Sequence, residues 1–278
     1  MLSLGFALLL LTAWSCKKSA AEGEKPILLV SIEPQRKMLE ELAEPYYSVV
    51  TLLPPGSNPE TFEPTVAQRM RAAKSQAYFP IGYLPFEEAF SATFEGKAPV
   101  IDTAAGIELL SDTHSHGDHD HAVADPHIWS SLRNGKIMAQ NMAAALAQLD
   151  SVHAQEYRER SAQLSARLDS LDAVAAQAAS GAQAFAVWHP SLSYFARDYG
   201  LKQIAVGQES KEVSIKELKR IIEEAREDSV RVFFFQREYD SRQADNLNQE
   251  IGSRLVVIDP LAYDWDTELI RIADELSR

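Results

Sequence analysis

Short apolar runs alternate with amphipathic stretches along this chain, and this alternation restricts the fold more than any other feature. In the first half, strands are predicted at 27–32, 49–54, 77–82 and 100–103, with helices between them at 35–43, 66–73 and 86–94. Nearly continuous apolar strands separated by helices are typical of parallel sheets covered on both faces. The sequence therefore predicts an α/β fold.

The second half repeats the pattern. Strands are predicted at 185–188, 203–206, 230–235 and 255–258, and helices at 192–198, 214–227, 241–251 and 266–276. A chain of 278 residues is long enough for two domains of ordinary size. Two lobes, each with a parallel sheet flanked by helices, fit this repetition better than one large sheet.

Two helices are predicted between the halves, at 134–149 and 154–180, and the longer contains no Gly or Pro. Its apolar residues Leu164, Leu168, Leu171, Ala175 and Ala178 recur at helical spacing, so one stripe can pack against both lobes. We expect an N-terminal lobe over 26–150, a linker helix over 151–181 and a C-terminal lobe over 182–278. A long surface helix of a single domain is the alternative.

The N-terminus carries an export signal. Residues 2–14 form an apolar run, too short for the roughly 20 residues that span a bilayer. Ser15-Cys16 follows this run and resembles the end of a bacterial lipoprotein signal, which implies a signal peptide over 1–16, a lipidated Cys16 and a tether over 17–25. The expected location is periplasmic or cell-surface, anchored by lipid; plain secretion with a free thiol is the alternative. Cys16 is the only cysteine, so no internal disulfide can form.

A histidine-rich loop, predicted at 112–125, indicates metal handling. It contains His114, His116, His119 and His121, interleaved with aspartates. Imidazole nitrogens bind zinc, copper and nickel near pH 7. The formal net charge of −13 disfavours nucleic acid as a partner. We expect this loop to capture metal transiently; a solvated acidic loop or an expression tag is the alternative.

Four further donors follow predicted strands. Glu60 lies in the loop after the second strand, His127 lies beyond the histidine-rich loop, and His189 and Asp259 each end a strand. Open parallel sheets bind ligands at the carboxyl ends of their strands. Two imidazoles and two carboxylates form a plausible tetrahedral set for one divalent ion. A site with four protein ligands favours binding of the ion over catalysis. Each residue taken singly has an ordinary structural explanation.

The motifs around these donors occur in a recognisable order. They are Gly-Ser-Asn-Pro-Glu-Thr-Phe-Glu-Pro at 56–64, the histidine-rich loop, Asp-Pro-His-Ile-Trp at 125–129, His-Pro at 189–190 and Val-Ile-Asp-Pro-Leu at 257–261. In this order they resemble the solute-binding proteins of zinc and manganese ABC importers, in the zinc-uptake (ZnuA-like) branch. The resemblance implies a monomer of two lobes joined by a backbone helix, which binds metal between the lobes and delivers it to a membrane permease.

The resemblance also implies the ligands. His127, His189 and Asp259 match the ligand positions of that family, while Glu60 stands where a histidine is common. Replacing an imidazole nitrogen ligand by a carboxylate oxygen ligand favours harder cations, so it narrows the preference of the site for Zn²⁺ over Mn²⁺. Because His189 and the histidine-rich loop are retained, we expect zinc, with manganese or ferrous iron as the rivals.

Motifs for other classes are missing from the sequence. It contains no G-x-x-x-x-G-K-[ST] loop, H-E-x-x-H, G-x-S-x-G or G-x-G-x-x-G. ATP hydrolysis must therefore belong to a partner, and we expect no enzyme activity and no catalytic residue. The remaining alternatives are an exported zinc hydrolase, with Glu60 as general base beside the other three donors, and a surface adhesin.

Overall fold

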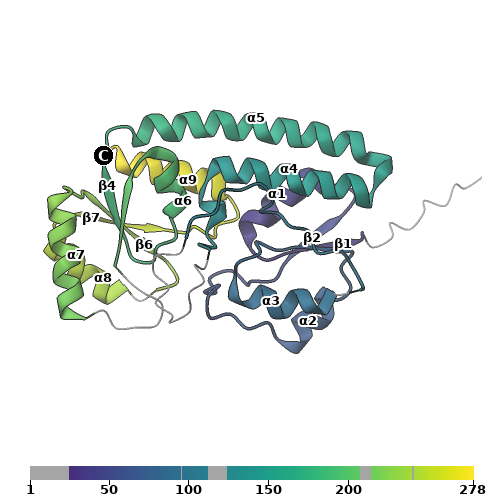
Figure 1. Ribbon diagram of the computed structural model, residues 1–278, viewed down its shortest axis with the longest axis horizontal. Helices are drawn as coiled ribbons and strands as arrows, with labels where there is room; N and C mark the ends of the chain where they lie inside the picture. The colour runs from purple at the N-terminus through teal and green to yellow at the C-terminus, as the bar shows by residue number, and fades with distance from the viewer. Residues whose placement is uncertain (1–24, 95, 112–123, 207–213, 240) are drawn as a thin grey trace, which may run out of the picture.

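The computed structural model describes residues 25–94, 96–111, 124–206, 214–239 and 241–278. Two lobes lie side by side, and two helices run along one long side of the molecule (Figure 1). Cys16 and the predicted signal peptide lie outside the described residues. Among the helices that are described, none combines the length and the apolar character needed to cross a membrane.

The N-terminal lobe contains a three-stranded parallel sheet in the order β2-β1-β3. Its helices α2 and α3 lie on the side away from α4 and α5 (Figure 1). The elements of this lobe are β1 (Ile27–Val30), α1 (Glu33–Ala43), β2 (Ser48–Thr51), α2 (Val66–Ala72), β3 (Ala77–Phe79), α3 (Pro85–Ser91) and the 3-10 helix η1 (Ala92–Phe94).

The C-terminal lobe contains a four-stranded parallel sheet in the order β5-β4-β6-β7. Strands β4 and β6 are buried along their whole length, as expected for central strands covered on both faces. The elements are β4 (Ala184–Val187), α6 (Ser193–Tyr199), β5 (Lys202–Ala205), α7 (Ile215–Glu227), β6 (Val232–Gln236), α8 (Ser241–Ile251), β7 (Arg254–Ile258) and α9 (Trp265–Leu276).

Helices connect the lobes. The 3-10 helix η2 (Ile128–Ser130) leads into α4 (Leu132–Leu149), and η3 (Ser151–His153) leads into α5 (Ala154–Ala179). With 26 residues, α5 is about 39 Å long and runs along the tops of both lobes in Figure 1. It packs against α4 and α9 through a buried stripe that includes Leu164, Leu168 and Ala175. The predicted fold class is thus confirmed, while the exact domain limits stay a prediction.

One hydrophobic core runs through both lobes. It joins β1 and β3, the buried faces of α4 and α5, one face of the second sheet, and α9. A separate smaller cluster lies beneath α7 and α8 on the other face of that sheet. Because a close-packed core resists deformation, the lobes cannot rotate widely about each other without breaking this packing.

The predicted strand at 100–103 differs from the structure. Only an isolated parallel bridge between Tyr78 and Val100 forms there. The segment lies beside β3, which has only three residues, and it follows Pro99, which has no N–H to donate to a ladder. Val100 is 42% exposed, so little burial favours a longer pairing.

Gly135 of α4 lies directly against Trp265 of α9. A Cβ at this position would lie 2.3 Å from the indole of Trp265, which is 2% exposed. Helix propensity predicts that Gly135→Ala would stabilise α4 by about 1 kcal/mol. We expect the reverse, a loss of about 1–3 kcal/mol, because the buried indole has no free space to enter. Urea unfolding measures the change.

Gly181 provides the control. A Cβ there meets no atom within 4 Å, so Gly181→Ala should change the free energy of unfolding by no more than about 0.5 kcal/mol. A stabilised Gly135→Ala variant would contradict the steric account.

Candidate metal centre

Three of the four predicted ligands converge between the lobes. Glu60, His127 and His189 each offer a donor atom, and these atoms lie within 4.8 Å of one another. His189 Nε2 is 2.8 Å from Glu60 Oε1 and 3.2 Å from His127 Nε2. Tetrahedral zinc, with bonds of about 2.0–2.1 Å to nitrogen, separates its ligand atoms by about 3.3 Å. The donors are therefore already spaced for one small cation.

Glu60 comes from the loop after β2. A hydrogen bond fixes its backbone, and a chain of contacts links its loop to the C-terminal lobe. Its backbone N–H donates to Asn58 Oδ1 at 2.8 Å, and Asn58 Nδ2 donates to the Tyr239 hydroxyl at 3.4 Å. Tyr239 in turn stacks on the His189 ring, with centroids 5.7 Å apart. The loop of one lobe is thus linked to the imidazole of the other.

His127 is oriented by Asp125, two residues earlier. Asp125 Oδ1 lies 2.8 Å from His127 Nδ1 and also accepts the backbone N–H of His127 at 2.9 Å. This contact leaves Nε2 as the ring nitrogen that faces Glu60 and His189. Burial opposes ionisation of Asp125, but hydrogen bonding and charge from His127 outweigh it and lower the Asp125 pKa. Sequence reasoning did not assign this role to Asp125, although an Asp two residues before a ligand His was a usable signal.

Gln236 fixes His189 at the end of the second sheet. The backbone N–H of His189 donates to Gln236 Oε1 at 3.2 Å, and Gln236 Nε2 donates to the carbonyl of His189 at 2.6 Å. Gln236 is fully buried. Because β4 and β6 are neighbours, the last residue of β6 lies beside the residues that follow β4. This partner was not predicted, since it depends on strand order.

Burial lowers the pKa of His189, and this outweighs the opposing effect of Glu60. The folded state therefore binds fewer protons than the unfolded chain just below pH 6.5, the ordinary histidine value. We expect the metal-free protein to lose stability as the pH falls below about 6.5. Urea midpoints at pH 7.5 and 5.5 measure this loss, which should shrink in His189→Asn. An equal loss in that variant would assign the pH dependence to other groups.

Asp259 lies outside the converged group. It follows β7, and its Oδ2 lies 3.3 Å from Arg237 Nη1. Both residues line a cavity of about 430 Å³ that also includes Glu238 and, from the other lobe, Pro54 to Ser57. Burial raises the pKa of Glu238, and the carboxylates of Asp259 and Glu60 add to the effect. Asp259 therefore lines a cavity between the lobes but lies outside the Glu60–His127–His189 cluster.

The histidine-rich loop, with His114, His116, His119 and His121, lies outside the described residues. Its two flanks are described. Ser111 and Ala124 form an antiparallel bridge, and the N–H of Asp125 donates to the carbonyl of Leu110 at 2.8 Å. The two flanks therefore lie side by side, and the second flank ends two residues before His127.

This chain is similar in sequence to proteins of zinc uptake. A family model described as "Zinc-uptake complex component A periplasmic" matches residues 28–268. The high-affinity zinc uptake system protein ZnuA of Bacillus subtilis is 26% identical over 270 residues, which cover 89% of this chain and 82% of that protein.

Solved structures agree with this match. A crystal structure of ZnuA superposes with a TM-score of 0.83 and 32% identity, covering 91% of this chain and 98% of that one. A zinc-bound deletion mutant of ZnuA gives 0.82 and 32%, covering 91% and 97%. This chain thus shares its fold, two parallel sheets joined by a long helix, with ZnuA, and it belongs to the periplasmic zinc-uptake component A (ZnuA) family.

Proposed function

We propose that this protein captures zinc outside the cytoplasm and delivers it to the permease of an ABC importer. The convergence of Glu60, His127 and His189 is the observation that carries this proposal. The ZnuA relatives support it, since the Bacillus subtilis protein is named for high-affinity zinc uptake. Isothermal titration of the metal-free protein with Zn²⁺ should reveal one tight site per chain. Absence of that site would refute the proposal.

Asp259 completes the coordination in this proposal. The cluster supplies three donors, and a structural zinc site usually has four. Asp259 lies at the cleft, where its carboxylate would leave Arg237 and turn towards the ion. Asp259→Asn should weaken zinc binding, whereas Asp264→Asn, a change in an exposed carboxylate paired with Lys37, should not. Equal affinities in the two variants would remove Asp259 from the site.

Zinc is the proposed cargo in preference to manganese or ferrous iron. Two imidazoles favour zinc, because affinity for nitrogen donors rises along the series from Mn²⁺ and Fe²⁺ towards Zn²⁺. Glu60 in place of a third imidazole reduces that margin. Competition titrations with Zn²⁺ and Mn²⁺ measure the difference in affinity between the two ions. Anomalous scattering at the zinc and manganese absorption edges, from crystals grown without added metal, identifies the natural ion.

The remaining parts of the proposal concern location and role. Cys16 carries the lipid that holds the protein, as a monomer, at the membrane surface, and His114, His116, His119 and His121 collect metal near the opening of the site. The protein acts as a stoichiometric carrier without enzyme activity, since a full set of protein ligands leaves no position for an activated water.

A further inference from the structure

Helix α2 and the turn after it form a basic and apolar surface on an acidic protein. We define the α2 surface by Val66, Arg69, Met70, Arg71 and Lys74. Val66 is 75% exposed and Met70 is 68% exposed, and the three basic residues are exposed as well. The sequence has no Asp or Glu from Pro64 to Phe86, although acidic residues outnumber basic ones 40 to 27 over the chain. The local charge is therefore opposite to the net charge.

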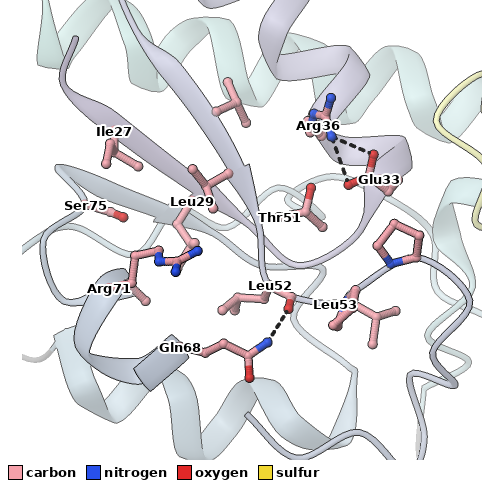
Figure 2. Close-up of a pocket in the computed structure, with 15 residues that line it drawn as sticks. Ile27, Leu29, Glu33, Arg36, Thr51, Leu52, Leu53, Gln68, Arg71 and Ser75 are labelled. Atoms are coloured by element: carbon pink, nitrogen blue, oxygen red, sulfur yellow. Dashed lines mark hydrogen bonds and ion pairs between the residues drawn. The ribbon is translucent and has the colours of Figure 1, made fainter. Parts of the chain in front are cut away.

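Among the described residues, no carboxylate forms an ion pair with the cations of the α2 surface. Arg69 Nε donates to the backbone carbonyl of Pro64 at 3.2 Å. Within the described part of the chain, Arg71 and Lys74 have no carboxylate within ion-pair distance. In Figure 2, Arg71 lies along a pocket beside α2 with no interaction drawn to the other lining residues, whereas Arg36 across the pocket is paired with Glu33. The guanidinium of Arg71 thus remains available for an external anion.

The α2 surface also lies close to the point where the N-terminal tether joins the fold. The N–H of Gln76, just after this surface, donates to the carbonyl of Ile27 at the start of β1 at 2.8 Å. Cys16 precedes Lys25, the first described residue, by nine residues. Nine residues reach at most about 30 Å. A lipid on Cys16 would therefore keep the membrane within about 30 Å of this region.

We propose that the α2 surface docks on the anionic phospholipid headgroups of the membrane that holds the lipid anchor. This inference rests on the lipid anchor proposed above. Lipid phosphates would accept hydrogen bonds from Arg69, Arg71 and Lys74, while Val66 and Met70 enter the interfacial layer. Because α2 lies on the side of the molecule away from α5, docking leaves the connecting helix facing outward (Figure 1).

The test uses the full lipidated chain in vesicles. Met70→Cys provides a thiol for a polarity-sensitive fluorophore, since a lipidated Cys16 cannot be labelled. We expect blue-shifted emission, quenched by nitroxide-labelled lipid, in vesicles containing phosphatidylglycerol but not in pure phosphatidylcholine. A fluorophore at Val152→Cys, which is 84% exposed and lies next to α5, should stay unquenched in both.

Charge variants complete the test. Replacing Arg69, Arg71 and Lys74 with glutamine should lower the ratio of docked to undocked protein at least tenfold, because each basic residue near an anionic surface contributes about fivefold. Glutamine at Lys216, Lys219 and Arg220 of α7, three exposed basic residues, is the matched control and should leave docking unchanged.

Three results would overturn docking on lipid. The first is an unquenched fluorophore at position 70, and the second is an equal loss of docking in both triple variants. The third is quenching that appears only when the permease is also reconstituted, which would indicate a protein partner. If the parent chain reacts with the thiol label, Cys16 carries no lipid. That result would refute both the lipid anchor and this inference. Zinc titration of the same samples separates these failures from failure of the transport proposal, because intact zinc binding with no docking refutes docking alone.

Discussion

Replacing His189 with alanine is expected to lower zinc affinity by more than about 100-fold. His189 Nε2 lies 2.8 Å from Glu60 Oε1 and 3.2 Å from His127 Nε2, so it is in reach of both other donors. Of the three donors that converge in the described part of the chain, its loss leaves Glu60 and His127, both from the N-terminal lobe. Even the loss of a residue that only hydrogen-bonds to a metal ligand typically costs 10–100-fold in metal affinity, so the loss of a direct ligand should cost more. Competition titration with a zinc chelator measures the change.

His153 is the matched control for this experiment. It is a half-buried histidine at the start of α5, where it stacks on Tyr46 with centroids 3.7 Å apart and bonds to Asp150 at 2.6 Å. His153→Ala removes an imidazole far along the chain from the cluster and should leave zinc affinity unchanged. Equal affinity in His189→Ala and the parent protein would exclude His189 as a ligand. Equal losses in both variants would indicate a folding effect.

Replacing Glu87 with alanine is expected to lower the free energy of unfolding by about 3 kcal/mol. Glu87 is 2% exposed, and its carboxylate accepts the N–H groups of Ile81 and Gly82, each at 2.7 Å, and of Leu84 at 3.1 Å. It also bonds to the hydroxyl of Ser31 at the end of β1. Alanine leaves these donors without an acceptor, and each unsatisfied buried donor costs about 1–3 kcal/mol.

Burial raises the pKa of Glu87, which opposes part of this stabilisation. The hydrogen bonds from the Ile81–Leu84 turn favour the ionised form and limit the rise. Glu87→Gln keeps the shape but turns an amide nitrogen towards N–H donors, so it should also destabilise the lobe. Urea unfolding measures both variants, with Glu88→Ala, a change in the adjacent exposed carboxylate, as control. Equal stability of Glu87→Ala and Glu88→Ala would contradict this role.

Much of the architecture could be predicted from local patterns. The predicted strand at 255–258 corresponds to β7 (Arg254–Ile258), and the predicted helix at 154–180 corresponds to α5 (Ala154–Ala179). Such patterns are readable because a strand or helix buries residues at a fixed period of its own sequence. The segment at 100–103 was predicted wrongly because its apolar residues lie at a lobe edge, where too few partners exist to form a ladder.

The candidate site was only partly predictable. His127 and His189 could be selected because each stands in a recognisable local motif. Their supports, Asp125 and Gln236, were not identified, and the pairing of Asp259 with Arg237 was not foreseen. Gln236 reaches His189 because β4 and β6 are neighbours in the second sheet, although the two residues lie 47 positions apart in sequence. No short-range pattern encodes that adjacency.

The sequence by itself determined the α/β class and the two-lobed plan and singled out candidate metal donors, because periodicity and donor chemistry are properties of single segments. Only the tertiary structure decided that Glu60, His127 and His189 meet, since a core shared through α4, α5 and α9 sets the distance between the lobes. The same folding brought Arg237 against Asp259 and left the cations of the α2 surface without an ion pair to any described carboxylate. Which charges become neighbours depends on packing between elements that lie far apart in the chain.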